Sequence, residues 1–295
     1  MILRMGKREM EYGGRYLGAL REANALMGDM DALRDRMAED GYLLIRRLHD
    51  PETVRAARRV VLENLQANGQ IDAARPLDVA GIPEGGRGAF LGGARAVTHT
   101  PEFLGVVESP ELMTFFAQYL QGDAMTYSYK WLRVVGREGF TGAHYDVVYM
   151  GRGTTNLFTC WTPLGEVPYE HGPLAILAGS HRLERVRETY GRMDVDRDNV
   201  SGWFSEDPIE LADTFGGQWL TTEFQAGDAV IFGMFTMHGS LINETDCYRI
   251  SCDTRYQRAD EPADERWIGD SPIAHYAWGK GEVTPMAEAR RRWGV

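Results

Sequence analysis

The sequence predicts a mainly β protein, an antiparallel sandwich or barrel with helices packed outside it. From Met125 onward, short apolar runs alternate with turn residues, a pattern typical of many short strands. Before that point, apolar residues recur at three- and four-residue steps, which predicts helices. We therefore expect the 295 residues to form a single domain, 1–295. Its helical part would cover about 1–122 and its β core about 123–258.

The expected helices have recognisable first and last residues. They cover 32–38, a stretch that begins at Asp50-Pro51, and a stretch from Ser109-Pro110 to about Gln121-Gly122. Asp31, Asp50 and Ser109 are good N-caps, because their side-chain oxygens accept hydrogen bonds from the free amides of a first turn. Gly41 can end the first helix in the left-handed conformation. The second helix carries one apolar stripe, made of Val54, Ala57, Val60, Val61 and Leu65.

The expected strands are short and lie mostly in the second half of the chain: 42–48, 125–135, 144–150, 155–164, 173–177, 229–237 and 247–257. Ile82–Gly93 is rich in glycine, which predicts a mobile loop. Residues 183–222 resemble an insertion, with charged turns and with Trp203, Phe204 and Trp219 exposed. We expect these two segments to form a lid over the substrate.

The composition is that of an ordinary globular protein with an acidic balance. Lys and Arg total 32 against 43 Asp and Glu, which gives a net charge of -11. That charge disfavours non-specific binding to nucleic acids and to anionic membranes. No apolar run approaches the roughly 20 residues of a membrane span, and the N-terminus lacks a signal peptide's apolar core. The three cysteines have neither zinc nor disulfide spacing. We expect a cytoplasmic protein that acts on a small molecule, and its oligomeric state is left open.

A His-x-Asp pair, His144-Tyr145-Asp146, is the sharpest motif in the sequence. On a strand, His144 and Asp146 would point to the same face, at the spacing that one metal ion needs. Far downstream, the apolar run 229–237 leads into His238, which can bring a third ligand to the same cavity. Two histidines and one carboxylate leave three positions open on an octahedral ion, which suits non-haem iron(II) that activates O2. Taken singly, the pair could be a surface ion pair and the late histidine a core residue, but their order and separation favour iron.

Arg249 supports the same interpretation. It lies eleven residues after His238, across a turn-like stretch and at the start of the strand expected over 247–257. If that strand returns beside the one ending at His238, it carries Arg249 back into the cavity, where an arginine can bind a carboxylate through two parallel hydrogen bonds. The distal carboxylate of 2-oxoglutarate would suit such a site. The alternative is a surface arginine on an edge strand.

Alternation along the same strand predicts a polar inner face. Its two faces divide as Arg249, Ser251, Asp253 and Arg255 on one side and Tyr248, Ile250, Cys252, Thr254 and Tyr256 on the other. Since unpaired buried charge is expensive, the polar set cannot be ordinary core. Either Asp253 and Arg255 pair with neighbours and close the barrel, or Arg255 contacts a polar or anionic group of the substrate.

Together these residues resemble the phytanoyl-CoA dioxygenase family of iron(II)- and 2-oxoglutarate-dependent oxygenases. The resemblance runs from Asp40-Gly41 to Gln257, and four blocks carry it: Lys130-Trp131-Leu132-Arg133, His144-Tyr145-Asp146, His171-Gly172-Pro173-Leu174 with Gly179-Ser180-His181, and Gly227-Asp228 through His238-Gly239-Ser240 to Arg249. It implies a double-stranded β-helix core of the jelly-roll or cupin-like kind. It also implies Fe(2+), 2-oxoglutarate and O2 as cofactor and cosubstrates, with succinate and CO2 released as the substrate is oxidised.

The resemblance also implies roles for single residues. His144, Asp146 and His238 would be the metal ligands, and Arg249 would anchor 2-oxoglutarate. Cosubstrate-binding roles follow in the same way for Ser240, Trp161 and Lys130, although a serine after a strand is commonly a turn residue and a strand tryptophan commonly core. Halogenating members lack the carboxylate ligand, so Asp146 favours hydroxylation.

Two other functions stay open at this point. One is a cupin-like metal dioxygenase that does not use 2-oxoglutarate, which Arg249 and Ser240 disfavour. The other is a catalytically silent β-sandwich that binds a partner or a small ligand, which an intact triad disfavours. The remaining histidines, His49, His99, His171, His181 and His275, are expected to be structural.

Overall fold

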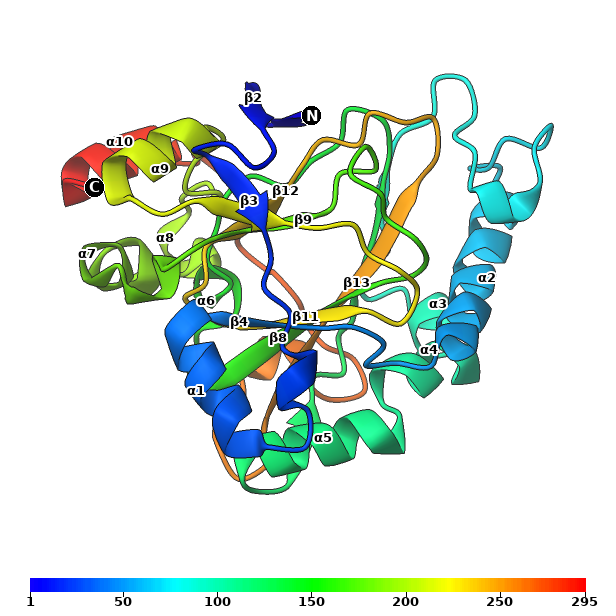
Figure 1. Cartoon of the computed structure of the whole chain (residues 1–295), viewed down its shortest axis with the longest axis horizontal. Coiled ribbons are helices and arrows are strands. Elements are labelled where there is room, and N and C mark those ends of the chain that lie inside the picture. Colours follow the sequence, from blue (N-terminus) through cyan, green and yellow to red (C-terminus); the bar gives the residue numbers. More distant parts are fainter.

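The computed structural model describes all residues, 1–295, and consists of two β-sheets with helices around them (Figure 1). The larger sheet has the order β4-β11-β8-β13-β7-β5, with β6 also paired to β13. Its strands are β4 (Tyr42–Ile45), β5 (Ala89–Phe90), β6 (Ala124–Thr126), β7 (Trp131–Val135), β8 (Leu157–Pro163), β11 (Ala229–Gly233) and β13 (Arg249–Arg258). All its pairs are antiparallel, which confirms the mainly β fold.

The smaller sheet has the order β12-β9-β10-β3, and a separate hairpin precedes it in the chain. The strands are β1 (Ile2–Met5), β2 (Arg8–Glu11), β3 (Leu17–Ala19), β9 (Leu174–Leu177), β10 (Trp219–Thr221) and β12 (His238–Ser240). The prediction of a helical N-terminus is therefore wrong for the first nineteen residues, which form β1 to β3. Glycines and short alternating runs there gave only weak strand signals.

Helices cover the outer face of the larger sheet and one end of the molecule. They are α1 (Met30–Asp40), α2 (Pro51–Ala67), α3 (Arg95–Thr98), α4 (Pro101–Val107), α5 (Pro110–Leu120), α6 (Val147–Met150), α7 (Glu184–Glu188), α8 (Val195–Asp198), α9 (Pro208–Phe215) and α10 (Met286–Trp293). Figure 1 shows α1 and α5 below the sheet, α2 to α4 on one side, and α7, α9 and α10 on the other. No helix is long and apolar enough to cross a membrane.

The predicted helix ends are largely confirmed. Asp50 and Ser109 accept amide hydrogen bonds from Thr53 and Leu112, as N-caps should. Asp29, and not the predicted Asp31, caps α1. Gly41 ends that helix with φ 81°, and a Cβ there would lie 2.3 Å from Nδ1 of His181. Only glycine fits both the left-handed backbone and this close approach.

Two predicted strands and the predicted insertion need correction. Residues 147–150 form α6 instead of continuing a strand, and β11 ends at Gly233, so that a separate short strand carries His238. Residues 183–222 are not wholly an insertion, because β10 lies inside the smaller sheet. Of the three aromatic residues predicted to be exposed, Phe204 and Trp219 are buried, and Trp203 reaches the surface. Aromatic residues in a charged stretch were mistaken for exposed ones, because the buried partner strand was not visible in the sequence.

The predicted two-faced character of β13 is confirmed. Ile250 and Cys252 pack with α2 and α4 on the outer face, and Tyr256 packs with α1 and α5. The polar set therefore faces inward, between the sheets. One prediction about this strand is wrong: β13 lies between β7 and β8 and does not pair with the strand that leads to His238. The polar face of β13 still lies in the interior, because the two sheets face each other. Between them, an apolar cluster joins β4, β8 and β11 to β9.

Candidate metal centre and cosubstrate pocket

His144, Asp146 and His238 meet at the edge of the smaller sheet. A β-bridge joins His144 to His238 of β12, and Asp146 directly precedes α6. The chain turns into this helix immediately after the motif, so helix geometry and the bridge, more than strand alternation, bring the side chains together. All three residues are buried, and their ligand atoms lie within 4.8 Å of one another. Nε2 of His144 is 3.7 Å from Oδ1 of Asp146, and Nε2 of His238 is 3.8 Å from the same oxygen.

Backbone carbonyls orient both imidazoles. Nδ1 of His144 lies 2.9 Å from the carbonyl oxygen of Gly142, and Nδ1 of His238 lies 3.0 Å from that of Thr236. Since a carbonyl can only accept, each Nδ1 must carry the proton, which leaves the lone pair of each Nε2 directed at the shared site. This is the tautomer that binds a metal ion.

The second oxygen of Asp146 is held by two donors. The Thr159 hydroxyl donates to Oδ2 at 2.5 Å, and Nη2 of Arg255 donates to it at 2.9 Å. The guanidinium of Arg255 also lies 4.3 Å from the centre of the Trp131 ring. Oδ1 is thereby left to face the two imidazoles. Arg255 thus pairs with a neighbour, and that neighbour is the candidate metal ligand. A contact of Arg255 with the substrate stays a prediction.

Protonation at neutral pH suits a cation. Burial lowers the pKa of His144 to about 3, and the nearby His238 adds to the effect. Burial also lowers the pKa of His238. Burial alone would raise the pKa of Asp146, but the Arg255 guanidinium and the two imidazoles outweigh it and hold that pKa well below its usual value. Two neutral imidazoles and one carboxylate are the donor set of non-haem iron(II) sites with open positions.

Arg249 is a buried cation without an anionic partner. Its side chain is 2% exposed, its Nε has no hydrogen-bond partner, and no carboxylate lies within ion-pair distance of it. Burial lowers its pKa to about 10, and repulsion from Arg133 contributes. Asp253 acts electrostatically on both Arg249 and His238, but this carboxylate already binds Arg133 at 2.7 Å. An unpaired guanidinium in a protein interior is costly unless a ligand supplies the missing charge.

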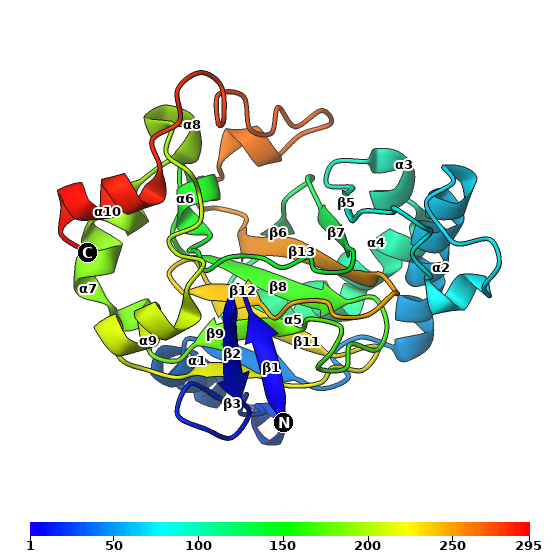
Figure 2. The same cartoon turned by 90° about the horizontal axis from the view of Figure 1, so that it is seen from above.

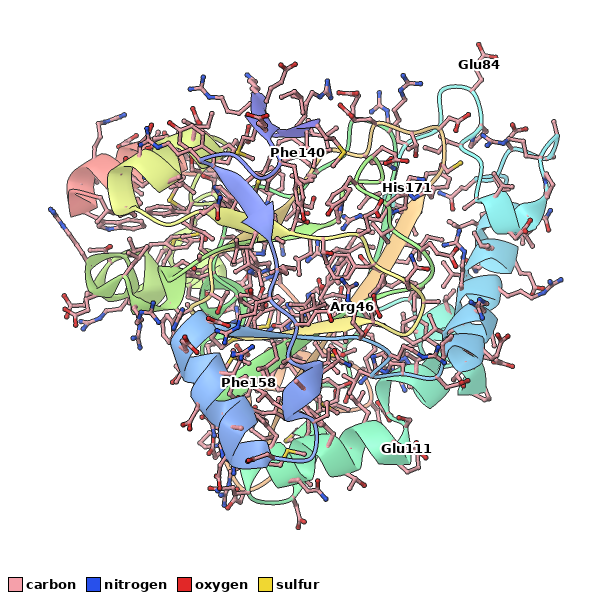
Figure 3. The ribbon with its side chains drawn as sticks, in the orientation of Figure 1. Arg46, Glu84, Glu111, Phe140, Phe158 and His171 are labelled. Atoms are coloured by element: carbon pink, nitrogen blue, oxygen red, sulfur yellow. The ribbon has the colours of Figure 1, made fainter.

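His171 lies beside the first residues of β13 in Figure 3, and its pKa is lowered by burial and by the charge of Arg249, among other groups. The Ser251 hydroxyl, on the same inner face as Arg249, is buried and has no hydrogen-bond partner. Buried polar atoms are nearly always satisfied in proteins. On the same face, Nε and Nη1 of Arg255 and Oε1 of Gln257 are unsatisfied as well, although the charge of Arg255 is offset by Asp146. The charge of Arg249 has no such partner, and it therefore indicates a space for a polar, anionic molecule.

Residues 37–251 match the phytanoyl-CoA dioxygenase family. This chain belongs to that family. A curated relative, the 1-deoxypentalenic acid 11-beta-hydroxylase of Streptomyces exfoliatus, is 26% identical over 255 residues, which are 81% of this chain and 84% of the relative. With the buried triad, this match makes the protein a non-haem iron(II)- and 2-oxoglutarate-dependent dioxygenase.

Solved structures of this kind share the fold. The carbocyclase SnoK from nogalamycin biosynthesis, described as non-haem and α-ketoglutarate-dependent, has a TM-score of 0.58 and 21% identity, covering 89% of this chain and 98% of its own. EctD from S. alaskensis, in its apoform, has a TM-score of 0.57 and 18% identity, covering 96% and 99%. These similarities confirm the expected double-stranded β-helix core.

Three further residues were predicted from the family resemblance to bind the cosubstrate. Ser240 lies on β12, buried, and its Oγ accepts a hydrogen bond from the amide of Thr141 at 2.9 Å. Trp161 lies on β8 in the apolar cluster between the sheets, 4.8 Å from the ring of Phe224. On the neighbouring strand it is directly opposite Asp253. Both positions are on the inner side, and their roles toward 2-oxoglutarate stay predictions.

Lys130 does not fit the predicted role. Its ammonium binds the Glu108 carboxylate at 2.8 Å and donates to the carbonyl of Tyr127 at 2.7 Å and to the hydroxyl of Thr126 at 3.2 Å. Glu108 is the C-terminal cap of α4, on the outer side of the sheet. Because its donors are used there, Lys130 ties a helix to the sheet. In the block Lys130-Trp131-Leu132-Arg133, the lysine therefore makes a structural contact.

A cavity of about 1020 Å³, here called the chamber, opens beside His144 and Asp146. Phe90 from the glycine-rich loop and Trp203 from the 183–222 segment line it. That these two segments form a lid over the substrate stays a prediction. In Figure 3, Glu84 marks the tip of that loop, which projects from the body of the molecule. Sequence reasoning missed a third contributor, the segment after β13, which brings Trp267, His275 and Trp278 to the chamber and crosses the top of the molecule in Figure 2. The aromatic residues clustered there were the available signal.

Proposed function

We propose that this dioxygenase hydroxylates an unactivated C–H bond of a small molecule and converts 2-oxoglutarate to succinate and CO2. In this proposal His144, Asp146 and His238 hold the iron, and Arg249 binds the distal carboxylate of 2-oxoglutarate. The observation that carries the cosubstrate assignment is the buried, unpaired guanidinium of Arg249. Hydroxylation is favoured over halogenation because the carboxylate ligand is present.

Bound iron would supply the activation of O2, which no protein side chain can provide. The protein's own residues supply placement. Thr159 and Arg255 hold one oxygen of Asp146, so that the other faces the metal position. Burial of the triad excludes bulk water, which strengthens the charge interactions in the site and protects reactive species from side reactions.

The test is an anaerobic titration of the purified protein with iron(II) and then with 2-oxoglutarate. We expect a visible charge-transfer absorption that appears only when both are present. A cupin-like enzyme that does not use the keto acid would bind iron without this absorption, and a silent sandwich would bind neither. Succinate formation that rises when a candidate substrate is added would then identify the substrate class.

Arg255 gives a second test, of how the site is positioned. Replacing Arg255 with Met removes the donor to Asp146, and we expect metal affinity or turnover to fall about 10- to 100-fold, as for other groups that orient a ligand. Metal binding would be measured by equilibrium dialysis, and substrate-free succinate formation would be measured beside it. If both stay normal and only substrate oxidation is lost, Arg255 contacts the substrate instead.

A further inference from the structure

The segment after β13 places a histidine in the wall of the chamber. His275 is one of the lining residues, and its Nδ1 lies 2.9 Å from Oδ2 of Asp196. The same carboxylate accepts hydrogen bonds through Oδ1 from the amides of Tyr276, Ala277 and Trp278, at 3.0, 2.8 and 2.8 Å. One buried aspartate thus fixes both the imidazole and the loop that carries it.

Arg266 anchors this arrangement to the rest of the molecule. Its guanidinium is fully buried and binds Asp196 at 2.6 Å and Asp264 at 2.6 Å. Asp194 lies within 3.3 Å of it and also binds Arg152 at 2.7 Å. A network of several paired, buried charges is rigid, because each member would lose more than one partner if it moved. His275 is therefore held in one place before any substrate arrives.

Only one ring nitrogen of His275, Nδ1, makes a hydrogen bond within the protein. Since a carboxylate accepts, Nδ1 carries the proton that it shares with Asp196, and Nε2 is the free lone pair of a neutral ring. Nε2 makes no hydrogen bond within the protein, and the ring is only partly buried, at 21% exposure. Burial lowers the pKa of His275 although Asp196 raises it, which agrees with a neutral ring. His275 thus lines the chamber with one hydrogen-bond acceptor, Nε2, that has no donor in the protein.

Aromatic rings connect His275 to the metal centre. Its ring lies 4.8 Å from that of Trp267, 5.3 Å from that of Trp278 and 5.8 Å from that of Tyr149. The Tyr149 ring is in turn 5.5 Å from the ring of His144. A molecule lying over Tyr149 can therefore meet His275 at one end and the metal centre at the other. Flat aromatic walls favour ring-containing apolar molecules, which stack on them.

The charges in the chamber indicate an uncharged molecule. Three arginines line it, and each already has an acidic partner. The pairs are Arg133 with Asp253 at 2.7 Å, Arg255 with Asp146 at 2.9 Å, and Arg290 with Glu210 at 2.5 Å. Nε and Nη1 of Arg255 have no hydrogen-bond partner, but the charge of its guanidinium is offset by Asp146. Glu206, the lining carboxylate outside these pairs, is exposed, so that solvent hydrates its charge. The chamber therefore holds no buried, unpaired charge for a substrate to neutralise, in contrast to Arg249 in the cosubstrate pocket.

We propose that His275 orients the substrate by accepting a hydrogen bond from a hydroxyl group of an uncharged, ring-containing, mainly apolar molecule. The contact selects which C–H bond faces the metal. This inference rests on the proposed function, because it concerns the same reaction.

The experiment compares four naphthalene probes by equilibrium dialysis, without oxygen and with iron(II) and 2-oxoglutarate bound. The probes are 1-naphthol, 1-methoxynaphthalene, 1-naphthoate and 1-naphthalenemethylamine, which carry a hydroxyl donor, no donor, a negative charge and a positive charge. We expect 1-naphthol to bind roughly 2- to 12-fold more tightly than the methyl ether, the range of a single hydrogen bond. Both charged probes should bind more weakly than 1-naphthol.

His275→Phe should abolish the preference for 1-naphthol over its methyl ether, and His275→Gln, which keeps an acceptor, should restore part of it. His99→Phe is the matched control, since His99 lies outside the chamber and its ring bonds to residues near it, the hydroxyl of Thr98 and the backbone of Ser128. Thermal unfolding would check each variant, and His275→Met replaces His275→Phe if the latter does not fold.

A 1-naphthol preference that survives in His275→Phe and in His275→Met would overturn the proposal. So would tighter binding of either charged probe, or no binding of the neutral ones. Failure of the proposed function is distinguishable, because it would appear as a missing charge-transfer absorption in the unchanged protein. The dialysis is therefore repeated on the metal-free protein, where the probe preferences can be measured independently.

Discussion

Replacing Asp146 with Asn is expected to abolish coupled turnover and to weaken iron binding by more than the 10- to 100-fold seen when only an orienting group is lost. The amide keeps the shape of the side chain but loses the charge that offsets the cation. It also removes the anion that pairs with Arg255 at 2.9 Å. That guanidinium is 1% exposed, so it would become a buried cation beside another cation.

The measurement is metal content and the charge-transfer absorption, with manganese(II) binding as a redox-inert check. Asp228→Asn is a matched control, because Asp228 is also buried and binds Arg46 at 2.7 Å, away from the triad. It should lower stability and leave metal binding intact. Full coupled oxidation by the Asp146→Asn protein would refute the ligand assignment. Asp146→Gly is a companion variant that opens a coordination position and tests whether chloride is admitted.

Arg249→Met is expected to change cosubstrate binding and stability in opposite directions. In the free protein the guanidinium has no anionic partner, so replacing it with an apolar side chain of similar length should raise the melting temperature. The same change should weaken 2-oxoglutarate binding roughly 30-fold to several thousand-fold, because removing one partner of a buried charge pair costs about 2–5 kcal/mol. Iron affinity should change little.

Thermal unfolding with and without 2-oxoglutarate measures both effects. The unchanged protein should gain stability from the cosubstrate, and the variant should not. Arg133→Met provides the contrast: its removal leaves Asp253 buried without its partner, so the melting temperature should fall. Unchanged 2-oxoglutarate dependence in Arg249→Met would exclude the anchor role. Arg249→Lys should rescue only part of the binding, since an ammonium lacks the planar fork.

The sequence alone predicted the elements whose signals are local. Asp50-Pro51 and Ser109-Pro110 begin helices because N-caps and prolines act within one turn. The alternation along β13 placed Arg249 and Arg255 on one face, since side chains alternate in any strand. The three candidate ligands were predicted because residue type and order remain visible without a fold.

The sequence could not show which strands are neighbours. β13 was expected beside the strand that leads to His238, yet it pairs with β7 and β8. Strand order depends on long-range pairing, which no short window of residues encodes. For the same reason Lys130 was assigned to the cosubstrate, although Glu108, distant in the chain, binds it.

What the sequence by itself determined is the set of reactive groups: two histidines, a carboxylate and an arginine in a mainly β chain. Only the tertiary structure decided which of these groups have partners. It showed that Arg249 has no anionic partner and that Arg255 binds Asp146. It also brought His275 to the chamber with Asp196 behind it. Whether a charge is paired or free depends on residues far apart in the chain, and so it is settled only when the chain is folded.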